Sequence, residues 1–313
     1  MAIDREDLKA RVARLAEHGV FIGTSSWKYP GWCGQLYDPD RYAYRGRFSQ
    51  SRFEKTCLRE YAEVFKTVSV DAAYYKFPDG NYLGELISQV PAEFQFALKV
   101  TDEITIKRFP NLPRFGERAG QPNPNFLDAE LFASRFLEPC TPFKGNIGLL
   151  MFEFSRFHQK DYLRGRDFVA ALDGFLARVP RGWRYGVEIR NRSFLQPQYF
   201  ESLRRHGVAH VFNSWQAMPS VGDQLELSGS RTGDGFVAAR FLLKPGRTYT
   251  QAVELFSPYG RVKEANPESR AAGGRVIKEG LEQSGGKKAF VYVNNRLEGN
   301  ALETIAGMID EAC

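Results

Sequence analysis

Eight short runs rich in β-branched and aromatic residues recur along the 313-residue chain, and this recurrence is the feature that most constrains its fold. They cover residues 20–25, 67–73, 94–100, 147–154, 185–190, 208–212, 236–242 and 289–294. Most intervals between them carry apolar residues at helical spacing, as in 58–65 and 169–179. Alternating strands and helices predict a parallel sheet. Eight such units in a chain of this length favour a closed (β/α)8 TIM-type barrel, with an open doubly wound sheet as the alternative.

The organisation within the chain indicates one barrel domain over residues 1–313. No repeat, low-complexity tract or linker divides the sequence, so we expect an N-terminal helix within residues 1–19 and the barrel over 20–312. Only the interval 214–234 shows no clear helix. Long connections, 101–128 and 244–268, follow the third and seventh predicted strands, on the side where barrel enzymes build their sites. They could cover a site or be structural surface loops.

Charge and cysteine content set weaker limits on function. Lysine and arginine number 43 against 37 acidic residues, and the net charge of +6 favours anionic partners without identifying one. The four cysteines, Cys33, Cys57, Cys140 and Cys313, form neither a metal-type pair nor a dense disulfide framework, which predicts free thiols in a reducing compartment. The N-terminus shows no apolar stretch typical of a secretory signal or a membrane span. We therefore expect a cytoplasmic protein with no membrane contact.

Alternation along the predicted strands indicates which side chains face the barrel interior. In 94–100, bulky residues alternate with Gln95, Ala97 and Lys99, so Lys99 should face inward near the C-terminal end of its strand. The same alternation turns Glu188 and Arg190 inward. Further polar residues in an inward phase or at a strand end are Thr67, Ser69, Asp71, Glu153, Arg240, Asn294 and Asn295.

The charged members of this set all lie near the C-terminal ends of their strands, where barrel enzymes assemble sites from residues distant in sequence. Two interpretations stay open for each residue. Because buried charges require partners, the three acids could simply pair with the three bases in a closed internal salt-bridge network. For the whole group we predict a functional cleft, since so many polar groups at one mouth are costly unless solvent or ligand satisfies them.

Aromatic residues follow the first, second and sixth predicted strands. Trp27, Tyr74 and Tyr75 belong to this set and could stack on a base or on the apolar face of a sugar, or could simply pack. No P-loop, dinucleotide glycine fingerprint, HExxH or G-x-S-x-G motif is present, and the four histidines lack ligand spacing. We therefore expect no cofactor and no transition metal. A Mg²⁺ or Mn²⁺ held by carboxylate oxygens stays open.

Six ordered segments carry a family resemblance: GTSSWKYPGWCGQLYDP, YAEVFKTVSVDAAYYKFP, FQFALKVTDEIT, IGLLMFEFSRF, YGVEIRNRSF and VYVNNRLEGNALETI. Together they span about residues 20 to 305, and through them the sequence resembles the YecE-like, DUF72-type family of unknown function. The resemblance implies a TIM-type barrel. It also implies that the family pattern falls on Gly23, Ser25, Trp27, Tyr29, Pro30, Gly31, Tyr74, Tyr75, Lys99, Glu188, Arg190, Asn294 and Asn295.

The sequence departs from the family pattern at four positions. Ser69 stands where the resemblance implies an acid, Asp71 where it implies Asn, Glu153 where Gln is usual and Asn191 where His is common. An acid has therefore moved, by this comparison, from the second strand to the fourth. The departure leaves the identity of a general base open.

The first functional hypothesis is a metal-independent enzyme acting on an anionic, hydroxyl-bearing small molecule, such as a sugar phosphate or nucleotide fragment. Lys99 and Glu188 would be catalytic: Glu188 as general acid/base, and Lys99 by stabilising negative charge or forming a Schiff base. The substrate-binding set would be Trp27, Asp71, Tyr74, Tyr75, Glu153, Arg190, Arg240, Asn294 and Asn295.

Two other hypotheses compete with this one. The net charge, the aromatic residues and Arg108, Arg114 and Arg118 in the connection 101–128 suggest a nucleic-acid-binding or nucleic-acid-processing protein. A non-catalytic module that recognises a metabolite at the barrel mouth is the third, because fold does not dictate chemistry.

Overall fold

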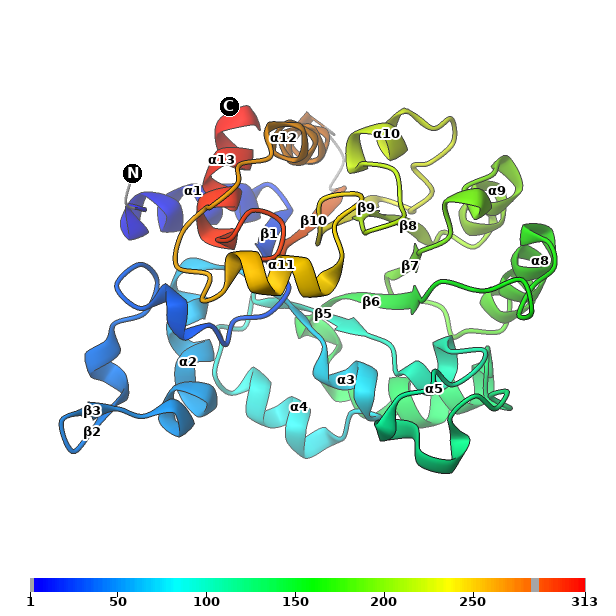
Figure 1. Cartoon of the computed structure of the whole chain (residues 1–313), viewed down its shortest axis with the longest axis horizontal. Helices are drawn as coiled ribbons and strands as arrows, with labels where there is room; N and C mark the ends of the chain where they lie inside the picture. The colour runs from blue at the N-terminus through cyan, green and yellow to red at the C-terminus, as the bar shows by residue number, and fades with distance from the viewer. Residues whose placement is uncertain (1–2, 283–286, 313) are drawn as a thin grey trace.

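Eight parallel strands close into a barrel in the computed structural model, as the sequence predicts (Figure 1). The structure describes residues 3–282 and 287–312. The barrel strands are β1 (Val20–Thr24), β4 (Thr67–Val70), β5 (Gln95–Lys99), β6 (Ile147–Phe154), β7 (Tyr185–Ile189), β8 (Ala209–Ser214), β9 (Phe236–Phe241) and β10 (Lys288–Val293). The first and last strands close the ring, since β1 pairs with β10 over five residues and with β4 at its end.

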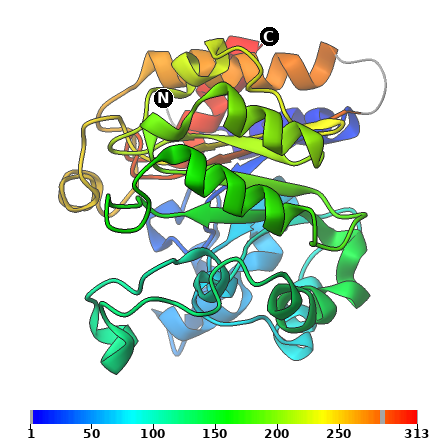
Figure 2. The same ribbon diagram turned by 90° about the vertical axis from the view of Figure 1, so that its right-hand side faces the viewer.

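Helices cover the outside of the barrel and explain why its strands are buried on both faces. Between or after the strands lie α1 (Arg5–Glu17), α2 (Gln50–Val64), α4 (Gly80–Ile87), α6 (Ala129–Leu131), α7 (Glu138–Cys140), α8 (Gly165–Leu176), α9 (Pro197–Arg205), α10 (Val221–Glu226), α12 (Pro267–Glu282) and α13 (Ala301–Ala312). A π-helical turn, Phe132–Leu137, joins α6 to α7. Figure 2 shows α8 and α9 lying against the outer face of the sheet.

The helical periodicity in the sequence correctly identified the buried faces. In α2, Leu58, Tyr61 and Ala62 are buried, and the Ser49 side chain accepts a hydrogen bond from the backbone N–H of Arg52 at the helix start. In α8 the buried residues include Leu172 and Phe175. These faces pack against the strands. Stretches with apolar residues at the helical spacing of 3.6 therefore alternate along the chain with stretches in which every second residue faces inward.

The barrel interior is divided along its axis. Its N-terminal half holds an apolar cluster that includes Phe21, Leu149, Val211 and Phe290. Each of these residues belongs to the inward phase of its strand. The charged residues of the same phase lie toward the C-terminal ends, so the apolar layers form a floor beneath them.

Short elements shape the connections at the C-terminal ends of the strands. They are α3 (Ala72–Tyr75), α5 (Asp102–Thr105), α11 (Tyr249–Phe256), the 3-10 turns Pro30–Trp32, Pro39–Tyr42, Pro113–Arg118, Thr141–Asn146 and Arg192–Phe194, and the hairpin of β2 (Ala43–Tyr44) and β3 (Arg47–Phe48). The interval 214–234, which shows no clear helix in the sequence, holds the short helix α10. Its six residues are too few for a periodic pattern, and a capping box between Ser220 and Asp223 fixes its start.

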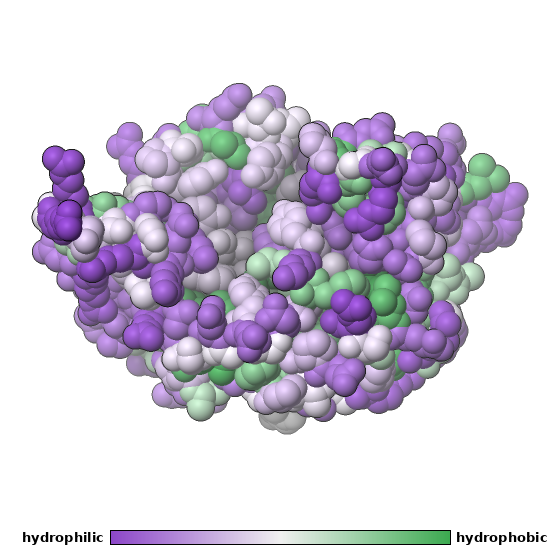
Figure 3. All heavy atoms as spheres, turned by 90° about the horizontal axis from the view of Figure 1, so that it is seen from below, coloured by the Kyte–Doolittle hydropathy of each residue, from purple (hydrophilic) through white to green (hydrophobic). Residues whose placement is uncertain are grey.

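The terminal helices, the cysteines and the surface complete the description of the fold. The helices α1 and α13 lie near each other at the two ends of the chain (Figure 1), and Arg11 pairs with Asp310 at 2.5 Å. Cys33, Cys57 and Cys140 are free thiols, while Cys313 lies outside the described residues. None of the helices in the described part combines the length and apolar character needed to cross a bilayer. On the face seen in Figure 3, hydrophilic residues predominate and hydrophobic ones form small patches.

Candidate functional site

Six charged side chains meet at the C-terminal end of the barrel. Lys99 ends β5, Glu153 and Glu188 lie near the ends of β6 and β7, and Arg240 lies near the end of β9. Asp71 and Arg190 directly follow β4 and β7. Ion pairs join all six, so the period-2 alternation along these strands correctly placed them together inside one ring.

Glu153 is the centre of this network. Its Oε2 lies 2.5 Å from Lys99 Nζ and 3.5 Å from Arg240 Nη1, and its Oε1 lies 2.9 Å from Arg190 Nη2. Burial raises the pKa of this carboxyl group, but Arg190, Lys99 and Arg240 outweigh it and lower the pKa to about 2. Glu153 is therefore a fixed negative charge that holds three cations together.

Glu188 is wholly buried. Arg190 donates to its Oε1 from Nε and Nη2 at 3.1 and 3.0 Å, and Arg240 donates to its Oε2 from Nη1 at 2.5 Å. Burial lowers the pKa of both guanidinium groups, but the neighbouring carboxylates outweigh it and raise the pKa overall. Both oxygens of Glu188 are thus committed to arginines, and the carboxylate holds these side chains in place.

A cavity of about 390 Å³, here called the mouth cavity, opens above this network. It is lined by Ser25, Ser26, Tyr29, Asp71, Tyr74, Tyr75, Lys99, Glu153, Ser155, Arg190, Trp215, Arg240, Leu242, Tyr249, Asn294 and Arg296. Four of these side chains are cations and two are carboxylates, so the lining carries a positive charge. Its size is within the range of pockets that hold small molecules.

Several polar atoms of the mouth cavity lack hydrogen-bond partners within the described residues. They are Ser25 Oγ, Asp71 Oδ1 and Arg240 Nε, all of them buried atoms. Asp71 Oδ1 lies 3.5 Å from Lys99 Nζ and 3.8 Å from Arg240 Nη2, ion-pair distances that leave its hydrogen-bonding capacity unfilled. A buried polar atom without a partner is costly, so these groups are suited to a bound polar molecule or water.

Aromatic rings contact two of the cations of the mouth cavity. Lys99 Nζ lies 4.2 Å from the centroid of the Tyr74 ring. Arg190 Cζ lies 3.9 Å from the centroid of Trp215. Such contacts are attractive and limit side-chain motion. Aromatic rings as well as carboxylates therefore hold Lys99 and Arg190 in position.

The structure does not bring every predicted residue into the mouth cavity. Trp27 is buried outside it, and its backbone carbonyl accepts a hydrogen bond from the Tyr37 hydroxyl at 2.5 Å. Asn295 is buried and accepts from the backbone N–H of Ala301 at 2.7 Å, at the start of α13. Asn294, Tyr74 and Tyr75 do line the cavity.

Sequence reasoning missed five lining residues, which are Ser26, Ser155, Leu242, Tyr249 and Arg296. Each lies just beyond a strand or in a connection, where no periodicity indicates orientation. Arg296 follows the Asn294–Asn295 pair, and its guanidinium lies 4.6 Å from the ring centroid of Tyr249. The long connection 244–268 was the one available signal, because Tyr249 lies within it.

The geometry bears on two alternatives, a metal site and a nucleic-acid interface. Among the described residues no group of three or more His, Cys, Asp or Glu side chains is arranged to hold a metal ion. In the connection 101–128, Arg114 pairs with Asp102 at 2.6 Å and Arg118 with Glu103 at 2.9 Å. These two arginines therefore hold the connection in shape instead of presenting unpaired charge.

Comparison with known families bears on the whole barrel. Residues 21–312 match the model of a family described as protein of unknown function DUF72. The chain belongs to the DUF72 family. Two crystal structures of a DUF72 family protein from Enterococcus faecalis V583 are similar to it, with TM-scores of 0.61 and 0.62 and sequence identities of 18% and 19%. The alignments cover 94% of this DUF72 chain and 95% or 97% of that protein.

A third similar structure is a DUF72 family protein from Thermotoga maritima MSB8. It has a TM-score of 0.54 and 17% identity, and the alignment covers 93% of this chain and 97% of the other. No curated protein matches the chain. At these identities the similarity to DUF72 structures shows a shared barrel and leaves the chemistry to the residues themselves.

Proposed function

We propose that the mouth cavity binds an anionic, hydroxyl-bearing small molecule, such as a sugar phosphate or nucleotide fragment, that Asp71 carries out acid-base chemistry on it, and that Lys99 stabilises the negative charge that develops. The observation that carries this proposal is the set of buried polar atoms without partners at the cavity floor. Ligand hydroxyl groups can donate to carboxylate oxygens and accept from guanidinium N–H groups. A hydroxylated ligand therefore matches both kinds of unpartnered atom.

The charge of the lining supports an anionic ligand. Four cations and two carboxylates line the mouth cavity, and the buried Glu188 leaves an excess of one positive charge. Arg190 and Arg296 lie at its wall under aromatic rings, where a ligand oxyanion can accept charge-assisted hydrogen bonds.

Proton transfer falls to Asp71 because it is the accessible carboxylate. Its side chain is 42% exposed, against 3% for Glu153 and 0% for Glu188. A general base must reach the proton that it removes, and Glu188 is enclosed by its two arginines. The proposal therefore gives Glu188 a positioning role and moves the acid-base role expected for it to Asp71.

Lys99 is placed to stabilise negative charge that develops on the ligand. Its ammonium group is 2.5 Å from Glu153 Oε2 and lies over the Tyr74 ring, so both contacts use its positive charge. A Schiff-base role would require a neutral amine. Borohydride treatment with carbonyl-bearing ligands tests this: Lys99 should remain unmodified.

The experiment is a thermal-shift and calorimetric screen of sugar phosphates and nucleoside monophosphates against the wild type, Asp71→Asn and Lys99→Met, with Lys55→Gln on the exposed face of α2 as control. A ligand of the folded state should raise the melting temperature of the wild type and the control. Lys99→Met should bind roughly tenfold more weakly. Asp71→Asn should bind within a few-fold but lose a factor of about 100 or more in turnover. Binding that is indifferent to Lys99 would contradict the proposal.

A further inference from the structure

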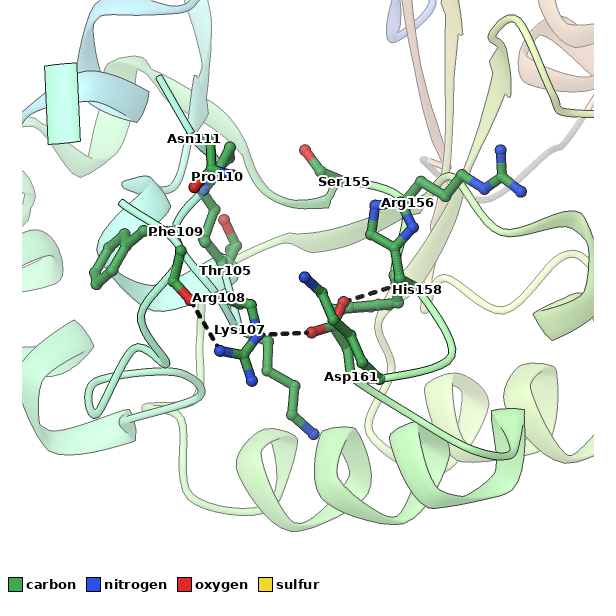
Figure 4. A pocket seen from close by; sticks show the side chains of 14 residues that line it. Thr105, Lys107, Arg108, Phe109, Pro110, Asn111, Ser155, Arg156, His158 and Asp161 are labelled. Carbon is green, nitrogen blue, oxygen red and sulfur yellow. Dashed lines mark hydrogen bonds and ion pairs between the residues drawn. The ribbon is translucent and has the colours of Figure 1, made fainter. Parts of the chain in front are cut away.

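A second cavity, of about 270 Å³, lies beside the barrel mouth and is here called the loop pocket. One wall is formed by residues 105–111 and 120 from the connection after β5. The other is formed by residues 155–158, 160 and 161 after β6. Figure 4 shows the two walls, with Lys107 and Arg108 on one side and His158 and Asp161 on the other. Ser155 lines both this pocket and the mouth cavity, so the two spaces adjoin.

The loop pocket is strongly basic. Lys107, Arg108, Arg156 and Lys160 line it, and Asp161 is its one acidic residue. Within the part of the chain that the structure describes, Lys107, Arg156 and Lys160 have no carboxylate within 4.0 Å of their charged nitrogen atoms. The pocket thus carries an excess of three positive charges, a charge distribution that favours a multiply charged anion.

Buried polar atoms in the loop pocket also lack partners. Thr105 is 1% exposed, and its Oγ1 makes no hydrogen bond within the described residues. Arg108 Nε lies 3.5 Å from Asp161 Oδ1, and neither atom makes a hydrogen bond there. A hydroxyl and a guanidinium N–H are both donors to an oxyanion, so an anion in the pocket would satisfy Thr105 and Arg108 together.

Lys107 also lines the loop pocket, and its ammonium group lies against an aromatic ring of the connection after β6. Its Nζ lies 3.3 Å from the centroid of the Tyr162 ring. Burial lowers the pKa of this ammonium group, and Asp161 partly counteracts that effect. A partly desolvated cation gains more from a neighbouring anion than a fully solvated one does.

We infer that the loop pocket binds a phosphate group of the same small molecule that occupies the mouth cavity, so that the ligand carries two anionic groups. The claim that the same ligand also occupies the mouth cavity rests on the proposed function. Lys107, Arg108 and Lys160 supply the charge for the phosphate, Thr105 supplies a hydroxyl donor, and Ser155 contacts the segment that joins the two parts of the ligand.

The test measures the affinities of pyrophosphate, a hexose monophosphate and a hexose bisphosphate by calorimetry. The proteins are the wild type, a Lys107→Gln/Lys160→Gln double variant, Lys99→Met and the control Lys55→Gln. The bisphosphate should bind the wild type at least about tenfold more tightly than the monophosphate, since its second phosphate adds charge-assisted contacts in the loop pocket. The double variant should lose this advantage and the binding of pyrophosphate, and should keep its affinity for the monophosphate.

The outcomes separate the two proposals. Pyrophosphate binding that is lost in the double variant and retained in Lys99→Met supports the loop pocket even if no sugar phosphate binds the mouth cavity. Equal affinity for the monophosphate and the bisphosphate, with the monophosphate lost in Lys99→Met, overturns the second anion site and leaves the proposed function standing. A single-stranded oligonucleotide that displaces pyrophosphate and binds more tightly than the bisphosphate overturns the assignment to a small molecule.

Discussion

Replacing Glu153 by Gln should remove the charge that holds the barrel-mouth network together. The carboxyl group has a pKa of about 2 in the folded protein against an ordinary value of 4.5. That difference corresponds to about 3 kcal/mol of unfolding free energy at neutral pH, to within about 1 kcal/mol. The figure agrees with the roughly 3–5 kcal/mol lost when one partner of a buried ion pair is removed. Urea unfolding at pH 7 should therefore show Glu153→Gln to be less stable than the wild type by about 3 kcal/mol.

The pH dependence of this difference identifies its cause. The folded-state pKa is the lower one, so the stabilisation is complete above about pH 4.5 and is lost as the pH falls from 4.5 to about 2, because the unfolded chain takes up the proton first. The gap between wild type and Glu153→Gln should shrink by more than half by about pH 3. Glu85→Gln, on the exposed side of α4, is the control and should change stability by less than about 0.5 kcal/mol. A gap that is absent at pH 7 or independent of pH would refute the reasoning.

A compensating change tests whether charge balance is the reason. The strand register pairs Ser69 with Ala97, one inward position below Lys99, and Ser69 Oγ is buried without a hydrogen-bond partner in the described residues. Ser69→Asp alone adds a fourth carboxylate to three cations and should destabilise the protein. In the Glu153→Gln background the same change restores the charge balance and should be stabilising. A double-mutant cycle should give a favourable coupling of about 2 kcal/mol or more, and additive effects would contradict the argument.

Three further outcomes are expected. Burial lowers the pKa of His210 to about 4 from 6.5, so the unfolding free energy of the wild type should fall by about 3 kcal/mol between pH 6.5 and pH 4. Unfolding measured at each pH should show that His210→Gln lacks this dependence, and an unchanged profile would be inconsistent with a buried neutral imidazole. A Cβ on Gly23 would lie 2.1 Å from the Thr67 carbonyl oxygen where β1 meets β4, so Gly23→Ala should fail to give a cooperative unfolding transition; a stable variant would show that the barrel can open there. Trp215→Leu should free the Arg190 side chain and weaken binding of a sugar phosphate several-fold with little change in Tm, and equal affinity would assign the ring to packing alone.

The strands made much of the site predictable. In a closed parallel barrel every second residue faces inward, so one alternation rule placed Lys99, Glu188 and Arg240 in the same ring although they are far apart in sequence. The rule needs no knowledge of loops. It could not say which of the inward carboxylates a ligand can reach, because accessibility depends on which arginines enclose each one, and this is a property of the packed ring.

Beyond the strand ends the sequence offered less. Asn294 and Asn295 look equivalent as neighbours after the last strand, yet one lines the mouth cavity and the other accepts a hydrogen bond from the start of α13. Trp27 is similar in type to Trp215 but packs away from the cavity. Side-chain direction in a connection follows from turn geometry and from the neighbours that enclose it, and neither has a periodic signature. The loop pocket was missed for the same reason, since its walls are two connections.

The salt-bridge network and the ligand site are therefore parts of one arrangement. A network that served stability alone would commit every donor and acceptor, as Glu188 does with its two arginines. The groups around the mouth cavity do not: Arg240 Nε and Asp71 Oδ1 make no hydrogen bond within the described residues. Buried ion pairs contribute little net stability compared with apolar packing, but they fix the directions of the groups that they hold. The wholly buried Glu188 thus keeps the guanidinium groups of Arg190 and Arg240 in fixed orientations, and these in turn hold the carboxylate of Glu153. Binding and proton transfer at the mouth cavity require this preorganisation.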